Sequence, residues 1–173
     1  GNRQGGHVVV VRDREVRQRL GELCGPTLRL YAAQVAAGES PFNTVVPSAV
    51  DVATALDTPT DRFALFEHLG DVPVALVVSV DLAVVASMDK DLDRVGLVTG
   101  ASIYPLVWNI LLAARAEGLG GVVTTAVVPA EAEVRRLLDL PETHAVAALI
   151  PLGVPVRQLT RLKRQPVEDF TTV

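Results

Sequence analysis

The chain has 173 residues, a formal net charge of −4 and apolar side chains at 49% of its positions. This length and hydrophobicity exclude a disordered or fibrous protein and predict one domain over residues 1–173. The acidic balance disfavours nucleic-acid binding, and no apolar run is long enough to span a membrane.

Cysteine and histidine usage limits the chemistry further. The single cysteine, Cys24, excludes a disulfide framework and indicates a reducing compartment. The chain opens without a basic and apolar leader, so we expect a cytoplasmic protein. The three histidines show no ligand spacing, and Asp89, Asp91 and Asp93 lack the glycine and the glutamate that complete a calcium loop. We therefore expect no metal site.

The first part of the chain predicts a strand followed by a long helical region. Residues 7–12 are mostly β-branched, which is typical of a buried strand. Asp13 is placed to cap a helix, which Gly25-Pro26 is expected to kink or interrupt, and residues 28–37 resume a helical pattern. Residues 38–60 show no regular periodicity and predict a long loop, a kind of segment that is usually functional or mobile.

The middle of the chain contains its most apolar segments. A short helix is predicted over residues 61–68. Residues 72–80 are apolar at nearly every position, which predicts a central strand. An acidic link then leads into residues 103–114, where helix formers dominate and Pro105 suits a first helical turn.

The helix over residues 103–114 would be apolar on every face, and such a helix is buried on every face. A chain of this size can hardly wrap it completely. Either the helix is the spine of the domain, or a second copy of the protein covers its other side. Asn109 interrupts the apolar run, and we interpret it as a buried structural hydrogen-bonding residue or as a polar group beside a cofactor.

The last third predicts a strand, a helix, a second strand and an arm. The strands are expected at residues 121–128 and 145–152, with a helix at 131–140 that carries acidic residues in its first turn. Residues 153–173 are polar, contain two prolines and have no periodicity. This tail is expected to be an extended arm that lies on another surface.

Two polar clusters are candidates for binding. Asn2, Arg3 and Gln4 are donor-rich side chains beside glycines, and they form either a polar chain end or a ligand contact. Four cations, Arg157, Arg161, Lys163 and Arg164, fall within eight residues of the tail. They form either a solvated arm or a site that captures an anion such as a phosphate, for which arginine is well shaped.

Three segments resemble the FMN-dependent nitroreductase family. GNRQG resembles that family's S-G-N-R-Q-P-W segment before a strand. GASIYPLVWNILLAARAEGLGGVVTT resembles its long interface helix. EVRRLLDLPETHAVAALIPLGVP, followed by RLKRQPVEDF, resembles its closing helix, strand and basic arm. The matches occur in the right order over nearly the whole chain, so the sequence is identified as a member of this family.

The resemblance implies an α+β fold with an antiparallel sheet flanked by helices. It also implies an intertwined homodimer in which each C-terminal arm adds to the partner's sheet and two FMN molecules lie at the interface. The family takes a hydride from NADH or NADPH onto flavin N5 and passes electrons to a quinone or nitroaromatic acceptor in a ping-pong cycle. No side chain is therefore assigned a catalytic role, since the flavin carries the redox chemistry.

The resemblance also assigns candidate FMN-binding residues. Asn2 and Gln4 match positions that hydrogen-bond the flavin ring or ribityl chain. Thr124 and Thr125 match the segment that brings backbone amides to the ring edge near N5. Arg164 matches the basic residue that contacts the phosphate, with Lys163 as its neighbour.

One departure from the family pattern concerns the N-terminus. The family normally begins with a further helix that carries an R-x-S-x-R motif for the phosphate and ring, and this sequence starts after it. The resemblance therefore implies an N-terminally incomplete domain with residues 154–173 as its extended arm. Two alternatives to the enzyme stay open: a non-catalytic dimer that binds or sequesters flavin, and a degenerate family member without a cofactor.

Overall fold

The computed structural model describes residues 3–158 and 160–172. Within these residues one antiparallel sheet runs in the order β1-β2-β4-β3. Its strands are β1 (Gly6–Val11), β2 (Val74–Asp81), β3 (Gly120–Gly121) and β4 (His144–Gly153). The α-helices are α1 (Arg14–Ala36), α2 (Val52–Ala55), α3 (Ala64–Glu67), α4 (Tyr104–Ala116) and α5 (Glu131–Leu138). The 3₁₀ segments are η1 (Asp61–Phe63), η2 (Leu69–Asp71), η3 (Val98–Ser102), η4 (Val128–Ala130) and η5 (Val167–Asp169).

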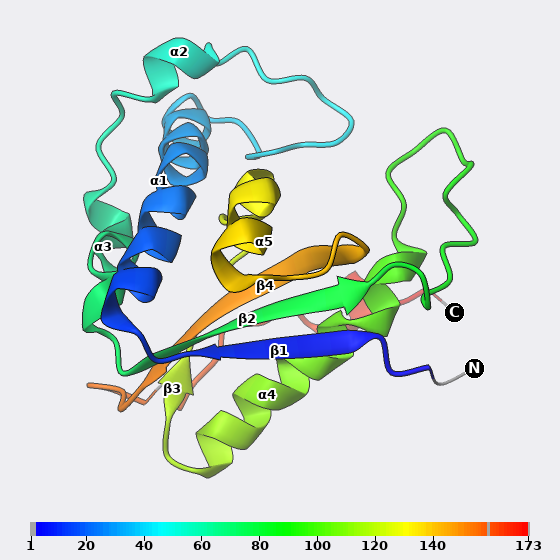
Figure 1. The fold of residues 1–173 in the computed structure, drawn as a ribbon. Coiled ribbons are helices and arrows are strands. Elements are labelled where there is room, and N and C mark those ends of the chain that lie inside the picture. Colours follow the sequence, from blue (N-terminus) through cyan, green and yellow to red (C-terminus); the bar gives the residue numbers. More distant parts are fainter. Residues whose placement is uncertain (1–2, 159, 173) are drawn as a thin grey trace.

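The sheet separates two layers of helices (Figure 1). Helices α1 and α5 lie on one face, and α4 lies on the other. Strand β2 is interior, as its continuous apolar run predicts, because both of its faces are covered. The expected α+β architecture with an antiparallel sheet is confirmed. None of the described helices is long and apolar enough to cross a membrane.

Alternation along β2 divides the buried side chains between the two layers. Ala75 and Val77 pack in the core beneath α1 and α5, whereas Val78 and Val80 pack against α4. Strand β4 carries a β-bulge, because Val78 pairs with Ala148 while the next residue, Ser79, pairs with Val146. The additional residue is Ala147, which packs with Ala148 on the α4 side.

The sequence predicts a kink or an interruption of the helix at Gly25-Pro26, and the interruption is wrong, because α1 is continuous through Pro26. Pro26 removes one backbone hydrogen bond of the helix, which ordinarily kinks or ends it. Leu20 and Leu28 are buried on either side of the proline, and their packing against the sheet keeps both halves of the helix in line. The Asp13 cap is confirmed, since its carboxylate accepts a hydrogen bond of 2.9 Å from the backbone N–H of Val16.

Three other sequence predictions need correction. The strand expected at residues 121–128 is only Gly120–Gly121, followed by an isolated bridge between Thr124 and Leu149. The predicted helix at 61–68 is divided between η1 and α3. The predicted loop at 38–60 includes the short helix α2, whose first turn is capped by Asp51.

Helix α4 is covered on one face only. Val107 and Ala114 are buried against the sheet, while Trp108 is 59% exposed and Leu112 is 51% exposed. Asn109 is also exposed, so the expectation that its amide is buried is wrong within this chain. The outer face of α4 therefore presents apolar side chains to the surroundings of a single chain.

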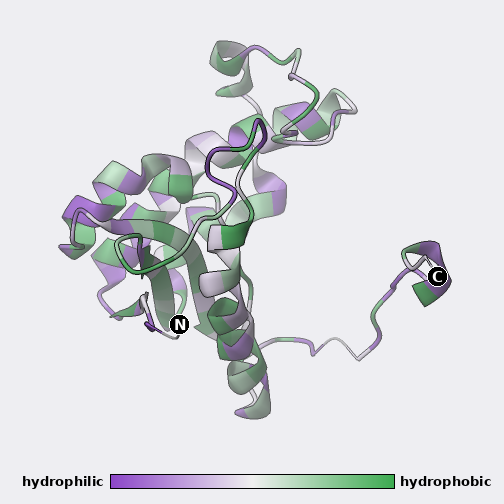
Figure 2. Cartoon of the chain, turned by 90° about the vertical axis from the view of Figure 1, so that its right-hand side faces the viewer, coloured by the Kyte–Doolittle hydropathy of each residue, from purple (hydrophilic) through white to green (hydrophobic). Residues whose placement is uncertain are grey.

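The C-terminal segment extends away from the rest of the chain (Figure 2). Apart from η5, its described residues form no helix or strand, in agreement with the predicted extended arm. Its apolar side chains are exposed, Leu162 by 66% and Phe170 by 67%. These side chains of the arm therefore pack little against the rest of the same chain.

Candidate functional site

A cavity of about 640 Å³ lies beside the first described residues. Its lining includes Arg3, Gln4 and Gly5. Gln4 has a φ of 52°, in the left-handed region that few non-glycine residues occupy. The carbonyl of Gly5 accepts a hydrogen bond of 2.8 Å from the backbone N–H of Asp81, which fixes this segment at the end of β2. The backbone next to Gln4 is therefore fixed in position, and the Gln4 side chain lines the cavity.

The other walls of this cavity come from the two ends of the loop between β2 and α4. Ala83 to Ala86 form the outgoing wall, and Ala101 and Ser102 form the returning wall. A Cβ atom at Gly5 would lie 2.7 Å from Cγ2 of Val84, so the glycine allows the loop to approach closely. The cavity combines small aliphatic side chains with one hydroxyl, one amide and one guanidinium group.

A second and larger cavity, the arm groove, has a volume of about 980 Å³. It lies between α4, the ends of β3 and β4, and the C-terminal arm. Arg115, Arg157 and Arg164 contribute three guanidinium groups, and Trp108 and Leu162 contribute apolar surface. Such a groove combines recognition of an anion with contact to an apolar ring.

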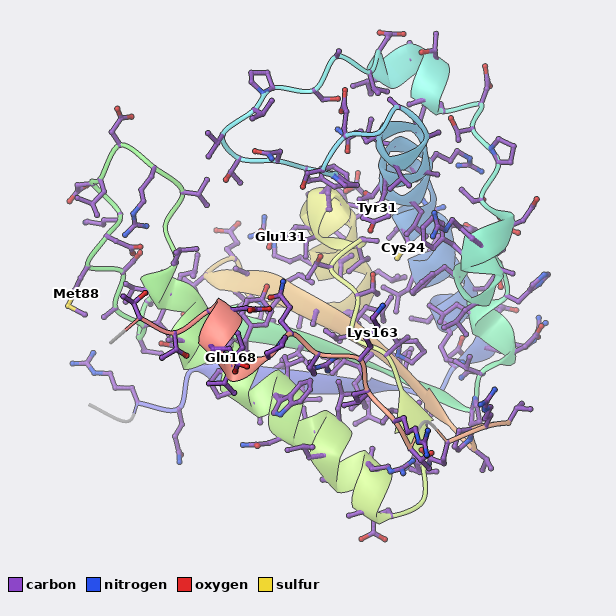
Figure 3. All side chains as sticks on the ribbon, turned by 180° about the vertical axis from the view of Figure 1, so that it is seen from behind. Cys24, Tyr31, Met88, Glu131, Lys163 and Glu168 are labelled. Atoms are coloured by element: carbon purple, nitrogen blue, oxygen red, sulfur yellow. The ribbon has the colours of Figure 1, made fainter. Side chains whose placement is uncertain are left out.

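The predicted residue Lys163 lies on the same arm (Figure 3). Its side chain is exposed, and its backbone carbonyl accepts a hydrogen bond of 3.2 Å from Nη1 of Arg164. The predicted residue Asn2 lies outside the described part of the chain. Sequence reasoning missed Arg115, which joins the groove from the last turn of α4 and is separated from the basic cluster by many residues.

The two threonines lie at the opposite edge of the sheet from Gln4. Thr124 bridges β4 through reciprocal hydrogen bonds of 2.9 Å with Leu149, and its Oγ1 accepts a hydrogen bond of 3.1 Å from the backbone N–H of Ala126. Thr125 is exposed, and its carbonyl accepts a hydrogen bond from Val128. Neither threonine lines the Gln4 cavity or the arm groove.

One chain does not bring these predicted residues together. Thr124 pairs with Leu149, Leu149 with Val77, and Val77 with Val9, so these residues form one row across the sheet. Gln4 precedes β1, five residues along the chain from Val9 at the far end of that row. The usual spacing between strands and rise along a strand therefore separate Gln4 from Thr124 by roughly 20 Å. The Gln4 cavity and the arm groove also share no lining residue.

The chemistry of these groups fits the flavin mononucleotide that the family resemblance implies. The amide of Gln4 can donate to and accept from a polar ring edge or a ribityl hydroxyl. The guanidinium of Arg164 can hold a phosphate in a bidentate manner. These two groups lie in different cavities of the chain: Gln4 lines the first cavity, and Arg164 lines the arm groove.

Solved structures share this fold. The NADPH:FMN oxidoreductase of Vibrio harveyi, in complex with NAD+, matches with a TM-score of 0.61 and 22% identity over 98% of this chain and 59% of that one. A BluB-like flavoprotein from Clostridium difficile matches with a TM-score of 0.63 and 19% identity over 99% and 80%. Iodotyrosine deiodinase, bound to FMN and 3-iodo-L-tyrosine, matches with a TM-score of 0.60 and 18% identity over 99% and 79%. No curated protein matches the sequence.

The sheet order, the two layers of helices and the basic arm thus define an α+β protein with the fold of these flavoprotein structures. The Nitroreductase family model matches residues 1–154. The chain therefore belongs to the Nitroreductase family. It spans little more than half the length of the Vibrio harveyi enzyme, at 59%.

Proposed function

We propose that this protein is an FMN-dependent NAD(P)H oxidoreductase that works as a homodimer and reduces a quinone or nitroaromatic acceptor. The main observation behind this proposal is that Gln4 and Arg164 line different cavities of one chain. The outer face of α4 and the C-terminal arm of the same chain expose apolar side chains. A second copy that covers α4 supplies the missing half of each site.

The chain's own residues hold and orient the cofactor in this proposal. Arg164 and Lys163 neutralise the phosphate, and Asn2 and Gln4 hydrogen-bond the ring or the ribityl chain. The segment of Thr124 and Thr125 brings backbone to the edge of the ring, where the N–H of Thr125 is the donor, because the N–H of Thr124 is bonded to the carbonyl of Leu149. When bound, the flavin supplies two-electron chemistry at N5, which the amino-acid side chains do not provide.

The open surfaces support the dimer. Trp108 and Leu112 expose about half of their surface on α4, and Phe170 is 67% exposed on the arm. Trp108 and Leu112 lie one helical turn apart, and exposed apolar side chains gathered in this way mark an interaction site. Two copies related by a twofold axis would bury the α4 faces against each other and give each arm a surface on its partner.

The first experiment is to measure the absorbance spectrum of the purified protein and of its heat-released supernatant. The proposal expects FMN at about one equivalent per chain, reduction of the bound flavin by NADH or NADPH, and reoxidation by a quinone or nitroaromatic. Arg164→Gln should weaken FMN binding about tenfold, since a charge-assisted contact to phosphate is lost. The matched control is Arg161→Gln, an exposed arginine on the same arm that does not line the groove.

The outcomes separate the enzyme from its alternatives. Bound FMN that neither nicotinamide reduces would favour a flavin-binding or flavin-sequestering dimer. A protein that stays colourless and does not bind added FMN would favour a family member without a cofactor. Equal losses of FMN binding in Arg164→Gln and Arg161→Gln would contradict the role given to Arg164.

A further inference from the structure

The loop between β2 and α4, residues 82–103, supplies most of the wall of the Gln4 cavity. Its outgoing limb contributes Ala83 to Ala86, and its returning limb contributes Ala101 and Ser102. The spacing of these two limbs therefore sets the width of the cavity. The loop exposes apolar side chains at its far end, where Met88 points away from the rest of the chain (Figure 3).

One carboxylate joins the two limbs. Asp89 is 4% exposed, and its Oδ2 accepts a hydrogen bond of 2.6 Å from the backbone N–H of Leu97. The N–H of Val98 lies 3.3 Å from both carboxylate oxygens, and Nη1 of Arg94 donates to Oδ2 at 2.9 Å. The hydrogen bond from Leu97, followed by that from Arg94, lowers the pKa of Asp89 to about 2.

No other hydrogen bond connects residues 82–89 with residues 94–102 in the described structure. The other hydrogen bonds of the loop are local, such as that from the N–H of Lys90 to the carbonyl of Ser87. A largely exposed loop without a second hydrogen-bonded connection would otherwise sample many conformations. The hydrogen-bonded connection between the two limbs thus depends on a single buried side chain, whereas Val85 anchors the outgoing limb by packing against the core beneath α4.

We propose that Asp89 is a positioning residue for the electron acceptor: it ties the limbs of the 82–103 loop together and so fixes the walls of the Gln4 cavity. This inference rests on the proposed function, in which the Gln4 cavity adjoins the flavin. The wall side chains are small and, apart from the hydroxyl of Ser102, aliphatic, and Gln4 and Arg3 supply further polar groups. This combination suits a small flat acceptor with a polar edge, such as a quinone, and a looser loop would admit it with lower affinity.

The loop itself is tested first, in protein without flavin. Asp89→Asn removes the charge while preserving the size of the side chain, and it places an amide donor against the donors of Leu97 and Val98. Hydrogen exchange of the segment 87–99 should become about tenfold faster, and trypsin should cleave sooner after Lys90 and Arg94. The matched control is Asp91→Asn, which makes the same change at an exposed position of the same loop and should leave both rates unchanged.

Steady-state and half-reaction kinetics then test the role in acceptor binding. In Asp89→Asn, KM for a small quinone should rise about tenfold, while FMN affinity and the rate of flavin reduction by NAD(P)H stay within about twofold of the unchanged protein. The preference for a small quinone over a bulky one should also fall, because the walls are no longer fixed. A merely structural role would instead lower FMN affinity and both half-reactions together.

Three results would decide against these proposals in different ways. Unchanged exchange and cleavage in Asp89→Asn would overturn the tie between the limbs. Faster hydrogen exchange and cleavage of the loop with an unchanged KM for the quinone would overturn the role in acceptor positioning. Failure of the unchanged chain to bind FMN, or of its flavin to be reduced, would overturn the proposed function itself and with it the role of the cavity.

Discussion

Cys24 lies fully buried in the core between α1 and the sheet. Burial raises the pKa of its thiol to about 12, so the residue stays protonated and unreactive in the folded chain. An unfolded cysteine ionises near pH 8.5, and raising the pH above that value therefore favours unfolding.

We predict that the native chain reacts with a thiol reagent at pH 8 at least about a hundredfold more slowly than the chain unfolded in urea. Because the chain has one cysteine, the label reports on this site alone. Rapid labelling of the native protein would show that α1 separates readily from the sheet.

Arg17 is a second buried polar residue, at 6% exposure. Its guanidinium donates to the carbonyl of Arg12 and, at 2.8 Å, to the carbonyl of Gly70. It thereby connects the end of β1, the first turns of α1 and the segment before β2. The side chain satisfies backbone acceptors that the fold would otherwise bury without donors.

Arg17→Met keeps the aliphatic stem but leaves both carbonyls without this donor. We expect it to lower the free energy of unfolding by about 2–4 kcal/mol, measured by urea denaturation. Arg17→Lys retains a donor and should lose less. A loss in Arg17→Met no greater than that in the exposed control Arg19→Met would contradict a role in connecting these segments.

At the scale of elements, α1 is approached closely at Gly21 by the segment that contains α3 and η2. A Cβ atom at this position would lie 2.1 Å from the carbonyl oxygen of Phe66 and 3.0 Å from Cβ of Leu69. Gly21 is buried, so α3 and η2 lie against the backbone of α1 at this point.

Gly21→Ala should therefore destabilise the protein by about 1–3 kcal/mol, although alanine favours a helix over glycine by about 1 kcal/mol in the absence of contacts. Thermal or urea unfolding measures the change. The control is Glu22→Ala at the next, exposed position, which should have a small effect. A stabilising Gly21→Ala would show that α3 does not pack here.

Elements with strong local signals were predicted from the sequence alone. Strand β2 and helix α4 follow from long apolar runs with distinct residue types, and the first strand follows from its β-branched residues. The prediction of a strand at 121–128 was wrong, because an apolar run indicates that side chains are buried but does not indicate how the backbone is hydrogen-bonded. Ala126 and Val127 are buried in the core although they form no strand.

Candidate site residues could be proposed from the sequence where they lie in one short stretch. Gln4 stands between polar and glycine residues just before a strand, and Arg164 belongs to a basic cluster. Asp89 was not predictable, because its partners are mainly backbone N–H groups that become neighbours only when the loop folds. Arg115 reaches the arm groove only through the packing of α4.

At the scale of the whole molecule, the open α4 face predicts self-association. Trp108 is the single tryptophan of the chain and lies on this face, so its fluorescence reports on burial there. We expect a dimer by sedimentation at micromolar concentration, with Trp108 protected from a soluble quencher.

Leu112→Asp should convert this dimer to monomer and expose Trp108, since a charge would be buried at the interface. Leu56→Asp is the control, because Leu56 is similarly exposed, at 47%, beside α2 on the other side of the sheet from α4 (Figure 1). A monomer at every concentration would contradict the proposed dimer.

The bulge in β4 has a consequence for how this strand tolerates changes of length. Deleting one residue from a strand normally turns every later side chain to the opposite face. Here Ala147 is unpaired, and its removal would leave Val78 opposite Ala148 and Ser79 opposite Val146, as they are now. Deletion of Ala147 should therefore preserve the fold in circular dichroism and thermal unfolding, whereas deletion of Leu76 from β2 should not. In evolutionary terms, β4 can lose or regain one residue without any compensating change elsewhere in the sheet.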